Sequence, residues 1–272
     1  MRFLKSYLSR RWPAVASGYH TYRYARDMDL QSMCETGLGF RLQGNPAMQS
    51  GGFEPHETQL LQSLAPTTEL FIDVGANIGY FTCLMRSLSS SVIAIEPLGQ
   101  NLQHLYANLT ANEWSDVEVL PVGLGASVSL LHMYGGGTGA SLLKGWSGAS
   151  ADYRHMIPVN TLDNVCASRV AGRRACIKID VEGAEIDVLA GAVRVLDANP
   201  APRWLVEICL TENHPDGLNP SYAQTFDVFF SRGYAAFSVE AGMRPVTASD
   251  VQRWVSVRRR DFGYVSFFFE RP

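Results

Sequence analysis

A glycine-rich turn is the first group of residues in this chain with the types and spacing to do chemistry. The segment FIDVGANIGYFT (residues 71–82) places Asp73 just before a turn that contains Gly75 and Gly79. A glycine has no Cβ, so its backbone can approach a ligand closely. The turn lacks the G-x-G-x-x-G spacing that seats a pyrophosphate on a helix N-terminus. A ligand without phosphate therefore fits this turn better.

A single acid, Glu96, forms the second group, because it ends the next apolar strand 21 residues after Gly75. An acid at that distance can accept hydrogen bonds from both hydroxyls of a ribose. A turn for helix packing and a surface glutamate would explain either feature alone, whereas the two at this spacing indicate an adenosine site. NAD carries the same ribose, so a nicotinamide-dependent oxidoreductase stays open as an alternative.

Acids at the ends of two later strands form the third group. RACIKID ends at Asp180, with Glu182 two residues further on, and PRWLVE ends at Glu207. Carboxylates in such positions can take a proton from a reacting hydroxyl. Asp180 and Glu207 could instead hold a divalent cation, although solvated or ion-paired acids are the more common finding.

Four further residues with titratable side chains have weaker signals. Lys178 lies within an apolar strand, where a charge is rarely buried without a partner, so we expect it to pair with Asp73 or with a strand-end acid. His155 and His214 follow strands and could act as general bases, although a histidine alone in a loop is more often a surface residue. Glu185 is predicted to lie in the first turn of a helix, where the helix dipole favours a negative charge.

Strands and helices alternate along the chain, and the strands are continuously apolar, which indicates a parallel sheet covered on both faces. The prediction is a doubly wound α/β fold. Residues 127–159 hold the glycine-rich stretch 135–139, which could be a substrate lid or a permissive turn, with short strands on either side. Strands are expected at residues 68–74, 91–97, 117–125, 174–180, 202–210, 235–240 and 263–271, and helices at 54–64, 80–88, 98–113, 182–196 and 221–233.

Composition narrows the function classes. The 272 residues are 46% hydrophobic and 18% charged, which suits one α/β domain, and the net charge of −3 argues against nucleic acid as a partner. Five cysteines form no C-x-x-C pair, and no secretion signal or apolar run of about 20 residues is seen. We therefore expect reduced thiols and a cytoplasmic location.

The N-terminal segment has a composition of its own. Residues 1–26 carry six basic side chains and no acid, interleaved with apolar and aromatic residues. Such an arm could touch an anionic membrane peripherally, although packing over the domain is the favoured interpretation. The predicted organisation is an arm of residues 1–50, helical and basic, followed by a catalytic domain of residues 51–272. A homo-oligomer could form.

FIDVGANIGYFT, VIAIEP and IKIDVEGAEIDVLAGA, in this order, resemble the FkbM family of S-adenosylmethionine-dependent methyltransferases. The likeness covers roughly residues 52–240. It implies the class I methyltransferase fold, Rossmann-like with a mostly parallel seven-stranded sheet. It also implies O-methylation, typically of a hydroxyl on a sugar, glycolipid or polyketide-type natural product. Residues 1–50 and about the last thirty lie outside the likeness, so the substrate is not inherited from it.

The resemblance further implies that the glycine turn lines the methionine end of S-adenosyl-L-methionine and that Glu96 holds its ribose. A divalent metal is a weaker expectation, with Asp180 and Glu207 as its ligands. The predicted cofactor-binding residues are Asp73, Gly75, Ala76, Asn77, Gly79, Thr82, Glu96, Pro97, Asn101, Gly123 and Asp180, and the predicted catalytic residues are Asp180, Glu182 and His214.

Two other enzyme classes and one non-enzymatic class are alternatives to this prediction. The missing G-x-G-x-x-G argues against the oxidoreductase, and the intact strand-end acids argue mildly against a protein that binds the cofactor without catalysis. Adenine N6-methyltransferases usually carry Asn or Asp followed by Pro-Pro and an aromatic residue, whereas this chain has Asp-Val-Glu-Gly at 180–183. A small-molecule or glycan-like hydroxyl acceptor is therefore favoured.

Overall fold

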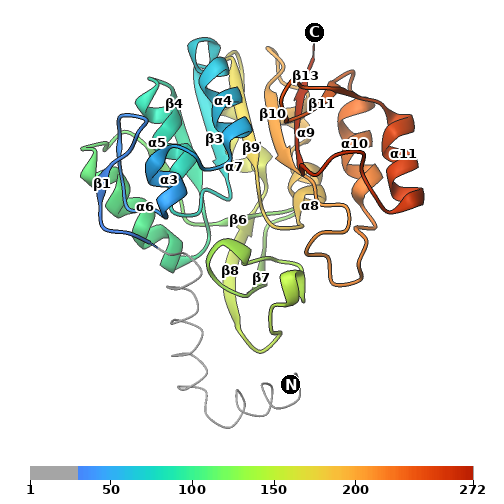
Figure 1. Ribbon diagram of the computed structural model, residues 1–272, viewed down its shortest axis with the longest axis horizontal. Coiled ribbons are helices and arrows are strands. Elements are labelled where there is room, and N and C mark those ends of the chain that lie inside the picture. The colour runs from blue at the N-terminus through green and yellow to red at the C-terminus, as the bar shows by residue number, and fades with distance from the viewer. Residues whose placement is uncertain (1–29, 272) are drawn as a thin grey trace.

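An eight-stranded sheet forms the centre of the computed structural model, which describes residues 30–271 (Figure 1). Its strand order is β12-β11-β13-β10-β9-β3-β4-β5. The five strands from β10 to β5 run parallel, and β13 lies antiparallel between β10 and β11. The strands are β3 (Leu70–Val74), β4 (Ser91–Ile95), β5 (Glu118–Leu120), β9 (Ala175–Ile179), β10 (Arg203–Glu207), β11 (Ala235–Ser238), β12 (Pro245–Val246) and β13 (Ser266–Glu270).

The predicted fold class is confirmed, with two differences in the strands. All seven predicted strands are present, and the two-residue strand β12 adds an eighth at one edge. The predicted strand 117–125 is broken at Pro121, because proline has no N–H to donate to a sheet ladder. Strand β5 ends before it, and β6 (Gly123–Leu124) joins a second sheet.

Helices cover both faces of the main sheet. Alternate side chains of β3 enter two separate cores: Leu70, Ile72 and Val74 pack toward one face and Phe71 toward the other. This alternation explains why β3 and β9 are buried along their whole length. One face carries α7 (Leu162–Val170), α8 (Glu185–Ala190), α9 (Val193–Leu196), α10 (Tyr222–Phe230) and α11 (Ala248–Val257), and the other carries α3 (Pro46–Ser50), α4 (Pro55–Leu64), α5 (Tyr80–Ser87) and α6 (Gly99–Ala111).

Residues 30–50 are packed onto the domain. The short strands β1 (Cys34–Glu35) and β2 (Arg41–Leu42) pair with each other, and Phe40 and Leu42 are buried in the same core as α5 and α6. The side chain of Asn112 exchanges two 2.7 Å hydrogen bonds with the backbone of Arg41. The first part of the predicted arm of residues 1–50, which includes the basic stretch 1–26, lies outside the described residues. None of the helices within residues 30–271 has the length and apolar character needed to cross a membrane.

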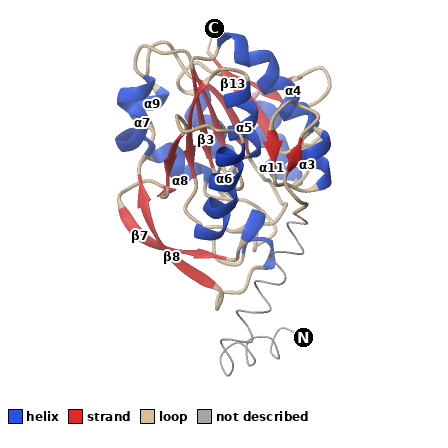
Figure 2. Ribbon diagram, turned by 90° about the vertical axis from the view of Figure 1, so that its left-hand side faces the viewer, coloured by secondary structure: helices blue, strands red, loops and turns tan. Residues whose placement is uncertain are grey.

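A smaller sheet lies beyond the main one (Figure 2). Its order is β6-β8-β7, with β7 (Ser129–Tyr134) and β8 (Arg154–Asn160) antiparallel. The predicted short strands on either side of the glycine-rich stretch are therefore present. The loop between them contains two 3-10 turns, η2 (Gly137–Gly139) and η3 (Trp146–Gly148).

The predicted helix at 182–196 is two short helices, α8 and α9, separated at Gly191 and Ala192. The chain crosses Gly125 closely at this break: a Cβ on Gly191 would lie 2.2 Å from the Gly125 carbonyl oxygen. The Gly191 carbonyl accepts a 2.9 Å hydrogen bond from the N–H of Asp163, which lies at the start of α7. The contacts of Gly191 with Gly125 and Asp163 therefore break the helix at a place where the local sequence alone favours a continuous one.

Gly191→Ala is expected to lower the free energy of unfolding by about 2 to 3 kcal/mol, because the added methyl overlaps backbone that cannot yield easily. Gly99→Ala is the matched control, since a Cβ there meets nothing within 4 Å and alanine is favoured over glycine in a helix. Urea unfolding followed by circular dichroism measures both. If the two variants were equally stable, the close approach of Gly191 to the Gly125 carbonyl would be contradicted.

Candidate functional site

A pocket lies at the carboxyl ends of β3, β4, β9 and β10, roofed by the smaller sheet and its loop. It encloses about 1030 Å³ of empty space, part of it open to solvent. The carboxyl edge of a parallel sheet, beside the strand at which the order reverses, is where α/β folds bind their ligands. The pocket is therefore the candidate site.

The glycine turn brings two strand ends into direct contact. Gly75 has φ +85, and a Cβ there would lie 1.8 Å from the carbonyl oxygen of Asp180. The backbone N–H groups of Gly75 and Ala76 both donate to the carbonyl of Ile95, at 2.9 and 3.1 Å. The turn thus ties β3 to β9 on one side and to β4 on the other, and no side chain fits at Gly75.

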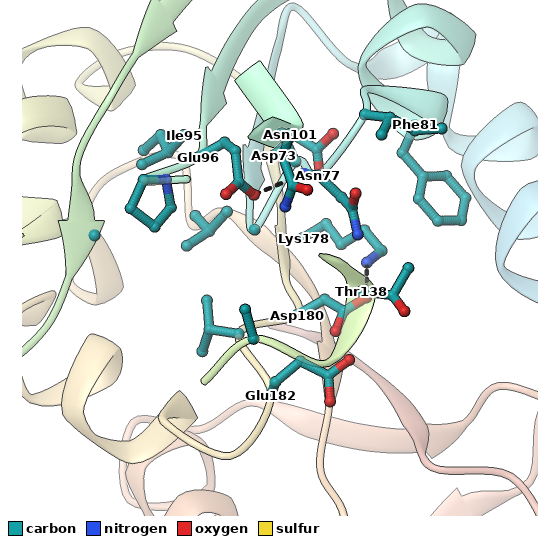
Figure 3. A pocket seen from close by; sticks show the side chains of 18 of the residues that line it. Asp73, Asn77, Phe81, Ile95, Glu96, Asn101, Thr138, Lys178, Asp180 and Glu182 are labelled. Atoms are coloured by element: carbon teal, nitrogen blue, oxygen red, sulfur yellow. Dashed lines mark hydrogen bonds and ion pairs between the residues drawn. The ribbon is translucent and has the colours of Figure 1, made fainter. Parts of the chain in front are cut away.

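Glu96 is buried at the end of β4 with its carboxylate aimed at this turn (Figure 3). It accepts hydrogen bonds from the N–H of Asn77 at 3.0 Å and of Leu98 at 2.8 Å, one on each oxygen. Burial raises the pKa of Glu96 to about 7, although these backbone donors act in the opposite direction. The Asn101 side chain donates a third hydrogen bond to this carboxylate, so about one of its four lone-pair sites stays open to a ligand hydroxyl.

Asn77 supplies an independent sign that the pocket is built for a ligand. It adopts the left-handed conformation, with φ 52, and its side-chain Oδ1 is buried without a hydrogen-bond partner in the described chain. Buried acceptors in folded proteins are nearly always satisfied. The amino group of S-adenosylmethionine is a donor of the required kind, so the residues present fit this cofactor.

Asp73 lies beneath the turn and is only 1% exposed. Thr82 donates a 2.6 Å hydrogen bond to its Oδ2. Burial raises the pKa of Asp73, whereas Lys178 and Thr82 lower it. Thr82 is fully buried on α5, so it holds Asp73 in place rather than reaching the pocket.

Lys178 sits opposite Asp73 in the β3–β9 register, and its side chain is 5% exposed. Its Nζ lies 2.7 Å from Asp180 Oδ2 and 4.8 Å from the centre of the Phe81 ring. Burial alone would lower the pKa of Lys178, but Asp180, Glu54 and Asp73 raise it further than burial lowers it. The ion pair that the sequence predicts is therefore present, with Asp180 as the partner.

Three more carboxyl groups face the pocket around this pair. Burial first, and then Asp180, raises the pKa of Glu182 to about 8 and that of Glu207 well above its ordinary range. Burial also raises the pKa of Glu54 to about 7. Lys178 carries the one basic side chain that lines the pocket in the described part of the chain. The site combines groups that accept protons near neutral pH with an excess of negative charge.

Most predicted site residues come together in this pocket, and three do not line it. Gly79 starts α5 with φ 89, where a Cβ would lie 2.3 Å from Leu105, so it serves the contact between α5 and α6. Thr82 lies behind Asp73, as described. His214 lies in the loop after β10, its ring edge-on to Trp146, and Nδ1 accepts from the Asp216 N–H. Predicted residues that line the pocket are Asp73, Gly75, Ala76, Asn77, Glu96, Pro97, Asn101, Gly123, Asp180, Glu182 and Glu207.

Several lining residues were not predicted from the sequence. Met48, Phe53 and Glu54 come from the segment around α3 and the start of α4, and Thr138 and Leu142 come from the loop after β7. Phe53 packs edge-on to Tyr80 with ring centres 5.1 Å apart. No local pattern marks these residues, because only the tertiary fold brings them to the strand ends.

The metal prediction is neither strengthened nor removed by the geometry. Asp180 and Glu207 both line the pocket. Within residues 30–271 there is no group of three or more His, Cys, Asp or Glu side chains placed to hold a metal ion.

The protein has a doubly wound sheet, a glycine turn after β3 and a buried acid, Glu96, at the end of the neighbouring strand β4. This is the arrangement of α/β enzymes that bind a nucleoside cofactor. Residues 73–235, more than half of the chain, match the family model described as the methyltransferase FkbM domain. The chain therefore belongs to the FkbM methyltransferase family and is a methyltransferase that uses S-adenosylmethionine. The oxidoreductase alternative is thereby set aside.

Solved structures with a similar fold share little sequence with this chain. The O-methyltransferase TomG from Streptomyces achromogenes, involved in tomaymycin synthesis, is 13% identical over 78% of each chain, with a TM-score of 0.45. An O-methyltransferase from Bacillus cereus is 13% identical over 82% of this chain and 83% of its own, also at 0.45. A ribosomal protein L11 methylase from Lactobacillus delbrueckii subsp. bulgaricus is 10% identical over 80% of each, at 0.42. No curated protein matches the chain.

Glu185→Gln is expected to make the protein more stable than the wild type at pH 8 but not at pH 5. Burial raises the pKa of Glu185 to about 7, so the folded state binds this proton more tightly than the unfolded state. The wild type therefore loses stability as pH rises from about 4.5 to 7, by up to about 3 kcal/mol.

Chemical unfolding across this pH range measures the effect. Asp187→Asn, which changes an exposed acid in the same turn, is the matched control, and its stability should follow the wild-type curve. A constant difference between Glu185→Gln and wild type would show that Glu185 is not held neutral by burial.

Proposed function

We propose that this methyltransferase acts on a hydroxyl group of a small, glycan-like or natural-product acceptor. The observation that carries the proposal is the set of carboxyl groups around Lys178, on the pocket wall across from Glu96 (Figure 3). Attack by a hydroxyl requires a group that takes its proton during or after transfer.

In this proposal the two sides of the pocket have different tasks. Glu96 accepts a hydrogen bond from a ribose hydroxyl. The 75–77 turn binds the methionine part together with Asn77 Oδ1, which has no partner within residues 30–271. S-adenosylmethionine supplies a methyl group activated by a positively charged sulfur. The surplus of carboxylates over the single ammonium of Lys178 favours a cation in the pocket electrostatically.

On the other side of the pocket, Glu182 receives the acceptor's proton and Asp180 orients the hydroxyl. Asp180 is held by Lys178 at 2.7 Å, so its charge is already neutralised. Glu182 has its pKa raised to about 8, which suits a general base near neutral pH. The smaller sheet and its loop cover the pocket with Met133, Leu142 and Ile157, which exclude water from the reacting groups.

Glu96→Ala is expected to weaken binding of S-adenosylhomocysteine by about 10- to 100-fold, because hydrogen bonds to a charged group contribute about 1.5 to 3 kcal/mol. Isothermal titration calorimetry measures the affinity. Glu118→Ala is the matched control: this acid lies on the neighbouring strand β5 and pairs with Arg169 away from the pocket. Wild-type affinity in Glu96→Ala would exclude Glu96 from the cofactor site.

Glu182→Gln is expected to lower turnover by about 10²- to 10⁴-fold, the usual contribution of a general base, with little change in affinity for S-adenosylhomocysteine. In the wild type kcat/KM should rise with pH toward about 8, as Glu182 loses its proton, and the variant should lack this rise. Transfer from labelled S-adenosylmethionine to a panel of glycosides and polyketide-type alcohols measures both. Glu240→Gln, at a strand end outside the pocket and paired with Arg244, is the control.

The same assay tests the acceptor chemistry. Mass spectrometry of the product is expected to show a methyl ether. A methyl group on nitrogen or carbon, or turnover that ignores Glu182→Gln and Asp180→Asn, would overturn the proposal while leaving the family assignment intact.

A further inference from the structure

Trp146 is buried although it lies in the glycine-rich loop between β7 and β8. Its side chain is 1% exposed, and its indole N–H donates a 2.6 Å hydrogen bond to Glu182 Oε2. A loop of this composition would ordinarily leave an aromatic ring at the surface. Here the ring contacts Glu182, which lies 36 residues further along the chain and shortly after the end of strand β9.

The contact with the strand end extends beyond this hydrogen bond. A Cβ on Gly183 would lie 2.5 Å from the Trp146 ring, so the indole packs directly on the backbone next to Glu182. From the same loop, Ser141 Oγ donates a 2.5 Å hydrogen bond to the carbonyl of Glu182. The loop therefore holds both the backbone and the carboxylate of this residue.

Glu182 needs such support because of its backbone conformation. Its φ is 58, in the left-handed region, which is sterically unfavourable for a residue with a Cβ. Strained residues of this kind persist where their surroundings hold them, and they gather at functional sites. The contacts from Trp146 and Ser141 are those surroundings.

We propose that Trp146 is a positioning residue that holds the Glu182 carboxylate toward the acceptor. The inference rests on the proposed role of Glu182 as proton acceptor. It also gives the loop a function, because Gly137, Thr138 and Leu142 of the same loop line the pocket. The loop thus couples the shape of the acceptor end to the placement of the acid.

The electrostatic surroundings set the sign of the effect. Glu182 faces Lys178 of β9 and Asp180 directly after it, Glu185 of α8 and Glu207 of β10. His214 contacts the Trp146 indole edge-on. The acids disfavour a further negative charge, whereas Lys178 and the Trp146 N–H favour it. Removing the N–H therefore makes Glu182 hold its proton to higher pH.

Trp146→Phe keeps a ring and removes the donor. The pH at which kcat/KM rises should move upward by about one unit, and kcat should fall while affinity for S-adenosylhomocysteine stays at the wild-type value. Trp254→Phe is the matched control, since it too removes an indole N–H that donates to a carboxylate, Asp261 at 3.0 Å, but far from the pocket in α11. Its pH profile should coincide with that of the wild type.

The double variant Trp146→Phe/Glu182→Gln separates this inference from the proposed function. Once Glu182 is lost, Trp146→Phe should cause no further change in the pH profile. If Glu182→Gln abolishes the rise but Trp146→Phe leaves it in place, the positioning role is wrong and the proposed function stands. If neither variant moves it, the role of Glu182 itself is wrong.

A measurement on the unaltered tryptophan covers the case in which Trp146→Phe does not fold. The chain has five tryptophans, so the ¹⁵N-indole spectrum contains few signals, and Phe variants of the other four assign that of Trp146. Its N–H shift should titrate with a midpoint near pH 8, and this titration should vanish in Glu182→Gln. An indole signal that does not change with pH would overturn the proposal.

Discussion

The buried ammonium group of Lys178 is the charge on which the site depends. It lies in the middle of a parallel sheet, 5% exposed, where an unpaired cation would be strongly unfavourable. Asp180 neutralises it at 2.7 Å, and Asp73 faces it across the β3–β9 register. Such a pair adds little net stability, because desolvation offsets the attraction. The effect of the ion pair is to fix the positions of the Lys178 and Asp180 charges at the carboxyl end of β9.

The position of that charge determines what the other acids do. Asp180 is balanced by Lys178, so Glu182, Glu207 and Glu54 share a poorly solvated space with no cation of their own. Their raised pKa values follow from burial and from Asp180. A pocket of this kind binds a positively charged ligand and takes up a proton near neutral pH. The close contact of Gly75 with Asp180 keeps the two halves of the site adjacent, because no side chain separates the ends of β3 and β9.

The parts of the site that the sequence predicts well are local ones. Asp73, the 75–77 turn, Glu96 and Asp180 each follow a continuously apolar strand, and the carboxyl ends of parallel strands necessarily meet at one edge. The family resemblance also implies Gly79 and Thr82 as cofactor-binding residues, but the sequence does not show which way the residues at the start of a helix face. Gly79 packs on Leu105, and Thr82 supports Asp73 from behind.

The parts that the sequence could not predict depend on distant segments. The break at Gly191 is caused by Gly125, and Trp146 is placed by Glu182, far along the chain in both cases. Phe53 and Glu54 reach the pocket only because residues 40–48 pack against α5 and α6. One local signal is a capping box: it links Thr247 and Asp250 and marks the start of α11, a helix that is not among those predicted from periodicity.

Backbone strain around the pocket links its chemistry to the stability of the fold. Glu54, Asn77 and Glu182 all line the pocket and all have left-handed φ values, of 40, 52 and 58. At about 1 to 3 kcal/mol each, these conformations would not persist in a loop free to relax. Each is tied to a rigid element: the Glu54 carbonyl accepts from Thr58 in α4, the Asn77 N–H donates to Glu96, and the loop holds Glu182. The fully buried strands of the sheet contribute the folding free energy that offsets this strain. The strained backbone in turn keeps the side chains of Glu54, Asn77 and Glu182 at the pocket.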